Sequence, residues 1–200
     1  DPTSGEVLIA GEDIAGMREG DVRRHRRDIQ IVFQDPYRSL NPRRTVGQSI
    51  VEGPVNFGLS ETEARLRAEE LMRVVGLSAD ALERFPHQFS GGQRQRICIA
   101  RALAMEPRVL VADEAVSALD VSVQAAVLEL LDDVRNRFDL AMLFITHDLR
   151  VAAQVCDRII VMRQGVVVEQ GLTAEVYANP QHEYTQSLLA AAPGHQMFAN

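Results

Sequence analysis

A glycine-containing turn and a pair of adjacent acids are the residues of this 200-residue chain best suited to chemistry on a phosphate. Ser90, two glycines and Gln93 come directly before a helical pattern, and small residues leave the N–H groups at a helix start accessible to an anion. The 19 residues after Gln93 end in an apolar run, residues 109–112, which Asp113 and Glu114 follow. The run predicts a buried parallel strand that places two carboxylates at its C-terminal end, where open α/β sheets bind ligands.

The two acids are not expected to do the same work, because successive side chains of a strand point to opposite faces. Asp113 is suited to bind Mg²⁺, often through a water molecule, since hard cations prefer carboxylate oxygens. Glu114 is suited to orient or polarise the attacking water, since phosphoryl transfer depends mostly on positioning and electrostatic stabilisation. The alternative is that both are solvent-exposed acids at a strand end without a chemical role.

Two further strand patterns end in a polar side chain. Apolar residues 29–33 predict a strand that ends at Gln34, just before the loop at Pro36. A neutral amide there could contact a metal-bound water and release it when the loop moves. Residues 140–146 predict a second apolar strand, and His147 at its end could donate to a phosphate oxygen. Taken alone, Gln34 would be interpreted as an ordinary turn glutamine and His147 as a structural histidine.

The stretch from Phe89 to Asp120 resembles the signature motif, the Walker B motif and the D-loop of an ATP-binding cassette (ABC) ATPase. FSGGQ, residues 89–93, takes the place of LSGGQ, and VLVADEAVSALD takes the place of the apolar run with DEP and SALD. Ala115 replaces the common proline, which removes no reactive group. The resemblance implies an α/β fold, namely the P-loop NTPase core of ABC ATPases with an inserted helical subdomain.

The resemblance also implies which ligand the signature turn contacts. It would face the γ-phosphate of an ATP held by the opposite subunit of a dimer, through Ser90, Gly91, Gly92 and Gln93. Residues 117–120 would be the D-loop, which contacts the partner across the dimer. Asp120, the last of these, is also expected to cap the following helix. That helix is expected to pack on the sheet through apolar residues at helical spacing, namely Val123, Val127, Leu130, Leu131 and Val134.

By the same resemblance, Gln34 is the Q-loop glutamine, which lies near the metal and links the nucleotide site to the membrane subunits of a transporter. His147 is the switch histidine, which contacts the γ-phosphate. ATP and Mg²⁺ are the implied cofactors, with Asp113 and Gln34 on the metal.

The family's phosphate-binding loop is not found in the chain. All 21 lysine-plus-arginine positions are arginine, whereas a Walker A loop, G-x-x-x-x-G-K-[ST], needs a lysine that reaches the β- and γ-phosphates. Residues 3–16 predict a strand or a short hairpin and are similar to the segment that follows the Walker A helix. We therefore expect the first strand and the Walker A helix to be missing from the N-terminus, and the isolated chain to bind ATP poorly.

Four parts follow from the motif order. Residues 1–38 would be the N-terminal part of the catalytic core, and residues 39–105 a helical subdomain with the signature. Residues 106–172 would complete the core, with a hairpin that turns at Gln164 and Gly165. Residues 173–200 would form a C-terminal tail. Within the helical subdomain, Ser60 and Glu63 form a capping-box pattern, and the helix that follows is expected to bury one side formed by Leu66, Leu71, Val74 and Val75.

Two stretches are similar to the oligopeptide, dipeptide and nickel importer branch of the family. They are the loop after Gln34, residues 35–54, and the tail, residues 173–193. In the tail, Glu183 replaces a proline of the NPxHPYT pattern, so His182 and Tyr184 keep their places with a less rigid turn. Some relatives carry a cysteine cluster in a longer tail; this chain has none, so no iron–sulfur site is expected.

Composition excludes several other classes of protein. A net charge of −7 and a pI of about 5.3 argue against a nucleic-acid binder, and the one dense basic run, residues 23–27, is expected to be a solvated helix face. There is neither a membrane-spanning apolar run nor a signal peptide, which predicts a cytoplasmic protein. Cys98 and Cys156 lack metal-ligand spacing and are expected to be buried, reduced thiols.

These features together predict the ATP-hydrolysing subunit of an ABC importer for short peptides or a related small solute. Its partners would be a second ABC ATPase domain, two transmembrane permease subunits at the cytoplasmic face of the membrane and, indirectly, an external solute-binding protein. Two alternatives remain open. One is a regulatory ABC ATPase without a transport role, and the other is a catalytically incomplete cassette that offers only its signature to a partner.

Overall fold

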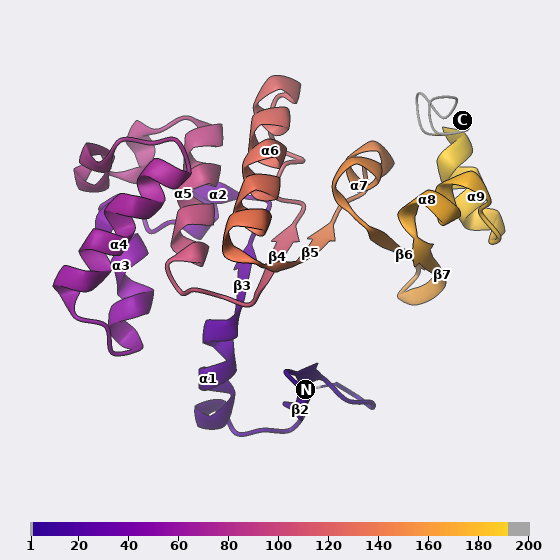
Figure 1. Ribbon diagram of the computed structural model, residues 1–200, viewed down its shortest axis with the longest axis horizontal. Coiled ribbons are helices and arrows are strands. Elements are labelled where there is room, and N and C mark those ends of the chain that lie inside the picture. The colour runs from indigo at the N-terminus through magenta and orange to yellow at the C-terminus, as the bar shows by residue number, and fades with distance from the viewer. Residues whose placement is uncertain (1, 192–200) are drawn as a thin grey trace. The chain divides into compact units, whose positions relative to one another are not determined.

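The computed structural model describes residues 2–191, which form two compact units, residues 2–143 and 144–191 (Figure 1). The first unit begins with a hairpin of strands β1 (Leu8–Ile9) and β2 (Glu12–Asp13), which pair antiparallel. Its two turn residues, Ala10 and Gly11, both have positive φ, 51° and 83°. That backbone matches the twist of a two-residue hairpin, so the predicted hairpin is confirmed.

A three-stranded sheet follows, with strand order β3-β4-β5. Strand β3 (Ile29–Val32) lies parallel to β4 (Val109–Asp113), in a register that pairs Ile29 with Val109 and Val32 with Ala112. Strand β5 (Ala141–Ile145) is the third. Because β3 and β4 are parallel and in register, their C-terminal ends meet at one edge of the sheet, as the sequence predicted for Gln34 and Asp113.

Between β3 and β4 the chain forms a group of helices. These are α2 (Pro36–Ser39), α3 (Val46–Asn56), α4 (Glu61–Val74), the 3-10 helices η1 (Ala79–Glu83) and η2 (Pro86–Gln88), and α5 (Gly91–Leu103). Helix α3 packs against both α4 and α5. The sequence-predicted helical insertion is therefore present, and it ends in the helix that carries the signature turn.

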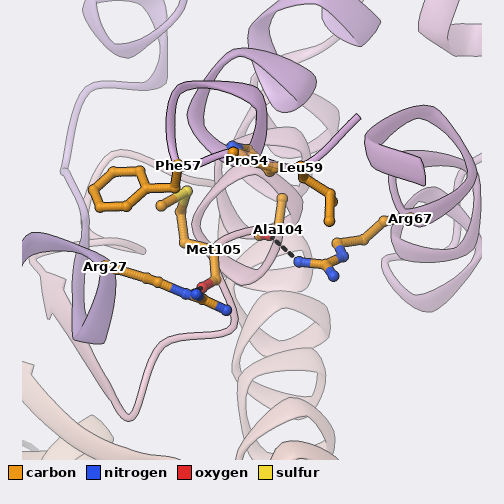
Figure 2. Close-up of a pocket in the computed structure, with 8 residues that line it drawn as sticks. Arg27, Pro54, Phe57, Leu59, Arg67, Ala104 and Met105 are labelled. Atoms are coloured by element: carbon orange, nitrogen blue, oxygen red, sulfur yellow. Dashed lines mark hydrogen bonds between the residues drawn. The ribbon is translucent and has the colours of Figure 1, made fainter. Parts of the chain in front are cut away.

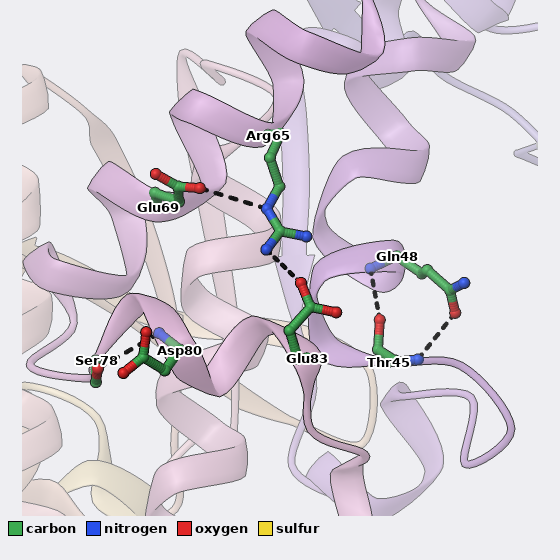
Figure 3. A network of polar contacts seen from close by, with 7 residues as sticks. All are labelled: Thr45, Gln48, Arg65, Glu69, Ser78, Asp80 and Glu83. Atoms are coloured by element: carbon green, nitrogen blue, oxygen red, sulfur yellow. Dashed lines mark hydrogen bonds and ion pairs between the residues drawn. The ribbon is translucent and has the colours of Figure 1, made fainter.

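Side-chain caps and an arginine bridge fix the ends of these helices (Figure 3). The Thr45 hydroxyl accepts from the N–H of Gln48, whose side chain accepts from the Thr45 N–H, at 3.2 and 3.0 Å. Arg65 on α4 reaches Glu69 on its own helix and Glu83 in η1. The hydrogen bond to Glu83 is the main reason that the pKa of Arg65 is raised. The bridge ties α4 to the 3-10 segment that precedes the signature.

In helix α4 the predicted cap is present, but the buried side differs from the predicted one. The Ser60 hydroxyl accepts from the Glu63 N–H at 3.2 Å, as the capping-box pattern predicted. Leu66, expected on the apolar side, is 62% exposed. The buried positions are Ala64, Ala68, Leu71, Met72 and Val75, spaced by three and four residues. The expectation is confirmed for Leu71 and Val75 and was wrong for Leu66, because two alanines complete the face that meets the neighbouring helices.

Helix α1 (Glu19–Asp28) precedes the sheet, and α6 (Val121–Phe138) follows β4. Helix α6 buries Val127, Leu130, Leu131 and Val134, which confirms the predicted apolar spacing. It ends at Asp139, whose φ of 51° places it in the left-handed region that terminates many helices.

The second unit contains α7 (Leu149–Val155), the antiparallel strands β6 (Arg158–Arg163) and β7 (Val166–Leu172), and helices α8 (Thr173–Ala178) and α9 (Glu183–Ala191). The predicted hairpin turn at Gln164 and Gly165 is confirmed, with φ of 51° and 80°.

The carboxylate of Glu169 on β7 orders the start of the tail. It accepts from the backbone N–H groups of Gln181 and His182 at 2.7 and 3.1 Å. His182 Nδ1 in turn accepts from the Tyr184 N–H at 3.1 Å. Burial opposes the ionisation of Glu169, but these donors outweigh it and lower its pKa. The turn that Glu183 was expected to loosen is thus held by hydrogen bonds. Residues 192–200 of the predicted tail lie outside the described residues.

Candidate functional site

Helix α5 starts with the turn that the sequence predicted to face a phosphate. Ser90 is its N-cap residue, and its hydroxyl accepts from the N–H of Gln93 at 3.3 Å. The Gln93 side chain accepts from the N–H of Ser90 at 3.0 Å. Phe89, just before the cap, is buried and acts as the expected apolar anchor. This capping box fixes the turn, and Gly91 and Gly92 between its two members carry no side chain on the exposed helix start.

Gly92 is needed for packing as well. A Cβ atom at this position would lie 2.4 Å from Cγ1 of Val123 on α6, a distance that real Cβ atoms do not show. At Gly91 the nearest atom, Cδ2 of Leu119, would be 3.9 Å away, an ordinary contact. The second glycine of the turn therefore lets α6 approach the start of α5. The sequence assigned this residue only a role in binding phosphate.

The two acids differ in backbone conformation. Strand β4 ends at Asp113, and Glu114 has a φ of 46°, in the left-handed region that non-glycine residues rarely adopt. The sequence-based argument that strand alternation separates the two side chains was therefore wrong, because Glu114 lies outside the strand. Such strained residues cluster at functional sites, where the surrounding structure must hold them in place.

Ser117 holds Glu114 and connects it to Gln34. The Ser117 hydroxyl donates to the backbone carbonyl of Glu114 at 3.0 Å, and its oxygen is 3.5 Å from Glu114 Oε2. Nε2 of Gln34 donates to the same hydroxyl at 3.0 Å. The structure thus brings Gln34 and Glu114 together through a serine. The sequence had placed Ser117 only in a loop that faces a partner, and the parallel pairing of β3 and β4 was the available signal for this contact.

Gln34 and Asp113 line one open cleft of about 540 Å³ at this edge of the sheet. The other lining residues are Phe33, Asp35, Arg38, Ser39 and Arg101. Among residues 2–191 there is no group of three histidine, cysteine or acidic side chains arranged to hold a metal.

Asp120 and His147 are not among the residues that line this cleft. Asp120 is the N-cap residue of α6, but its side chain makes no cap hydrogen bond, so the expected capping role is wrong. The carboxylate is exposed instead. His147 belongs to the second unit and is described only there. It lies between Thr146, whose hydroxyl accepts from the Asp148 N–H at 3.0 Å, and Asp148, the N-cap residue of α7.

The basic run on α1 is engaged in contacts within the chain. Arg23 donates to the Asn56 carbonyl at 2.9 Å, and Arg26 pairs with Glu19 at 2.6 Å. Arg24 and Arg27 pair with Glu12 and Glu106. These contacts agree with the expected arginine-rich helix face.

A smaller pocket of about 150 Å³ lies where α3 and α5 end, and it is also lined by Arg27 of α1 and Arg67 of α4 (Figure 2). Its lining includes the guanidinium groups of Arg27 and Arg67, which both pair with Glu106 at 3.2 and 3.0 Å. Arg67 also donates to the carbonyl of Ala104 at 3.1 Å. Since both cations are already paired, we assign this pocket to the packing of helix ends.

The two cysteines differ in accessibility, and their reactivity should differ too. Cys98 is buried in α5, and burial raises the pKa of its thiol to about 11. Cys156 is only half-buried, so the expectation of two buried thiols holds for Cys98 alone. The raised pKa leaves Cys98 with roughly a hundredfold less thiolate near neutral pH.

We expect maleimide to modify Cys156 before Cys98 in the folded protein, as mass spectrometry would detect; equal rates would contradict this.

Comparison with known proteins defines the class. The sequence model of the family described as "ABC transporter" matches residues 1–117, more than half of the chain. The chain therefore belongs to the ABC transporter family. Membership implies a nucleotide-binding domain, and the mixed helices and strands are the α/β fold of ABC ATPases.

Relatives and a solved structure narrow the comparison. The chain is 52% identical over 194 residues to the probable peptide ABC transporter ATP-binding protein y4tS of Sinorhizobium fredii, and 48% identical to the di/tripeptide transport ATP-binding protein DppF of Pseudomonas aeruginosa. Each alignment covers 96% of this chain, but the chain spans only 55% of y4tS and 60% of DppF. The structure of cbiO1 from Clostridium perfringens, part of the ABC transporter complex cbiONQ, is similar with a TM-score of 0.80 and 33% identity. That match covers 98% of this chain and 77% of cbiO1.

Proposed function

We propose that the chain is the ATP-binding and ATP-hydrolysing part of an ABC importer for short peptides or a related small solute. The observation that carries the proposal is the hydrogen bond from Gln34 to Ser117, which joins the ends of two parallel strands beside Asp113 and Glu114. The names of the relatives, which include peptide and di/tripeptide transport proteins, support the solute class.

Asp113 and Gln34 are the residues that would hold Mg²⁺. Their oxygen atoms are the ligands this cation prefers, and the cleft they line leaves room for waters and phosphate oxygens. When bound, the cation neutralises charge on the phosphates. The hydrogen bond to Ser117 orients the Gln34 side chain, because Nε2 is the donor in that bond. The side-chain oxygen, Oε1, is then the atom available to a metal ion or to its bound water.

Glu114 is proposed to orient and polarise the water that attacks the γ-phosphate. Its backbone has left the strand, and Ser117 fixes its carbonyl, so the carboxylate is positioned by the turn. A carboxylate held in this way acts through position and charge, which is most of what phosphoryl transfer requires of a protein.

The signature turn would serve a second copy of the domain. Ser90, the glycines and Gln93 form an exposed helix start, which is suited to an anion approaching from outside the chain. We propose that this anion is the γ-phosphate of ATP held by a partner cassette, that Asp120 contacts the same partner, and that His147 contacts the γ-phosphate. The exposed, uncapped carboxylate of Asp120 supports the partner contact.

The proposed assembly contains two cassettes and two permease subunits, with an external solute-binding protein as an indirect partner. The chain would bind peripherally at the cytoplasmic face of the membrane. No helix among residues 2–191 is both long and apolar enough to cross a bilayer.

The assembly can be tested by isolating the full-length protein from detergent-solubilised membranes. We expect two polytopic membrane proteins to be isolated with it, and short peptides with their binding protein to stimulate ATP hydrolysis after reconstitution. Isolation with soluble proteins alone, and hydrolysis that peptides do not change, would contradict the proposal and favour a regulatory ATPase.

A further inference from the structure

Helix α5 binds the segment that carries Gln34, residues 33–39. Nε2 of Gln95, in the second turn of α5, donates to the backbone carbonyl of Phe33 at 3.3 Å. Phe33 directly precedes Gln34, and Gln95 is completely buried. The contact joins residues 62 positions apart in the sequence. A buried amide therefore fixes the backbone immediately before the residue that contacts Ser117.

Gln95 does not contribute to packing in the way an apolar residue would. Its Oε1 is buried and has no hydrogen-bond partner among the residues that the structure describes. A buried acceptor without a donor is unfavourable, so an apolar side chain of the same size would stabilise the helix at least as well. What the glutamine provides, and such a residue would not, is the hydrogen bond to Phe33.

Two arginines of α5 hold the rest of the segment. The guanidinium group of Arg94 lies over the Tyr37 ring, 3.8 Å from its centroid. Arg94 is itself buried and fixed by a 2.7 Å hydrogen bond from Nε to the Pro86 carbonyl. Arg101 donates from Nη1 to the carbonyl of Ser39. The segment is thus held before, within and at the end of its short helix α2.

Because of these contacts, one helix both carries the signature turn and holds residues 33–39 in place. Helix α5 begins at Gly91, next to the N-cap Ser90, and the three holding residues follow within its 13 residues. An α-helix of this length moves as a unit, with a rise of about 1.5 Å per residue. A displacement of the signature turn would therefore move the backbone on both sides of Gln34.

We propose that Arg94, Gln95 and Arg101 are positioning residues, which set the place of Gln34 in the nucleotide site according to the position of the signature turn. The proposal rests on the proposed function, because ATP hydrolysis is the reaction in which the place of Gln34 matters. Gln95 is the residue whose replacement separates positioning from folding.

The test is Gln95→Met in the full-length protein with its partners. We expect kcat for ATP hydrolysis to fall about two- to tenfold, as loss of one hydrogen bond implies, and KM for ATP to change by less than about twofold. The melting temperature should stay the same or rise, because the orphaned acceptor is removed as well. Amide hydrogen exchange of residues 34–39 should become faster.

A matched control is Gln30→Met, which removes the same kind of bond, from Nε2 to the Arg26 carbonyl at 2.5 Å, but one that does not join α5 to residues 33–39. It should leave the exchange of residues 34–39 unchanged. Tyr37→Ala should lower kcat, whereas Tyr37→Phe, which keeps the ring under Arg94, should not.

Three results would overturn the proposal: unchanged kcat and exchange in Gln95→Met, a fall in kcat matched by a fall in melting temperature, or equal effects in the Gln30 control. Absence of ATP hydrolysis in the parental full-length protein would instead contradict the proposed function. Hydrogen exchange would still decide whether Gln95 holds the segment, so the two failures can be told apart.

Discussion

Replacement of Glu114 with glutamine in the full-length protein is expected to leave ATP binding intact and to lower ATP hydrolysis by at least about 100-fold. The amide has nearly the shape of the carboxylate, and Ser117 still donates to the carbonyl of residue 114. What the variant loses is the negative charge that we propose polarises the attacking water. The measurements are phosphate release for turnover and fluorescent-nucleotide titration for binding.

Glu106 offers a matched control for this substitution. It is also a glutamate in the left-handed region, with a φ of 52°, but it pairs with Arg27 and Arg67 away from the cleft. Glu106→Gln should keep hydrolysis within a few-fold of the parental rate. Hydrolysis retained in Glu114→Gln, or lost equally in both variants, would refute the role assigned to Glu114.

Gly92→Ala is expected to destabilise the fold by about 1–3 kcal/mol through overpacking. The new Cβ would meet Val123 Cγ1 at 2.4 Å, and a valine in a helix has essentially one available rotamer. Chemical denaturation of the full-length protein would give the change in the free energy of unfolding. Gly91→Ala is the control, because its Cβ finds ordinary contacts and alanine favours a helix.

A second substitution separates packing from phosphate binding at Gly92. Val123→Ala removes the methyl group that causes the clash, so Gly92→Ala with Val123→Ala should recover most of the lost stability. If ATP turnover stays low in the refolded double variant, the phosphate-facing role of Gly92 is supported as well. Equal stability of Gly92→Ala and Gly91→Ala would contradict the packing role.

Local signals in the sequence predicted much of the fold. The turn pair Gln164-Gly165, the capping box at Ser60 and the apolar spacing of α6 each depend on residues close in the chain, and each is confirmed. Leu66 was misplaced because helical spacing alone does not distinguish a side lined by large residues from one lined by alanines.

The site was harder to predict where it depends on turns and distant contacts. Strand alternation could not foresee that Glu114 turns out of β4 with a positive φ. The contact of Gln34 with Ser117 joins residues 83 positions apart. The contact of Gln95 with the Phe33 carbonyl joins helix α5 to the residue that follows β3. No periodicity or motif spacing within the chain carries these contacts, because they arise only from how the strands and helices pack.

Our central claim is that each ATP is bound between the acids of one chain and the signature turn of another. It can be tested in purified dimers of two differently tagged full-length copies. One dimer carries Glu114→Gln on one copy and Ser90→Arg on the other; the second carries both substitutions on one copy beside an unchanged one. We predict that ATP hydrolysis persists in the first dimer, which keeps one intact site, and is lost in the second. Hydrolysis that persists in the second dimer and is lost in the first would contradict the claim.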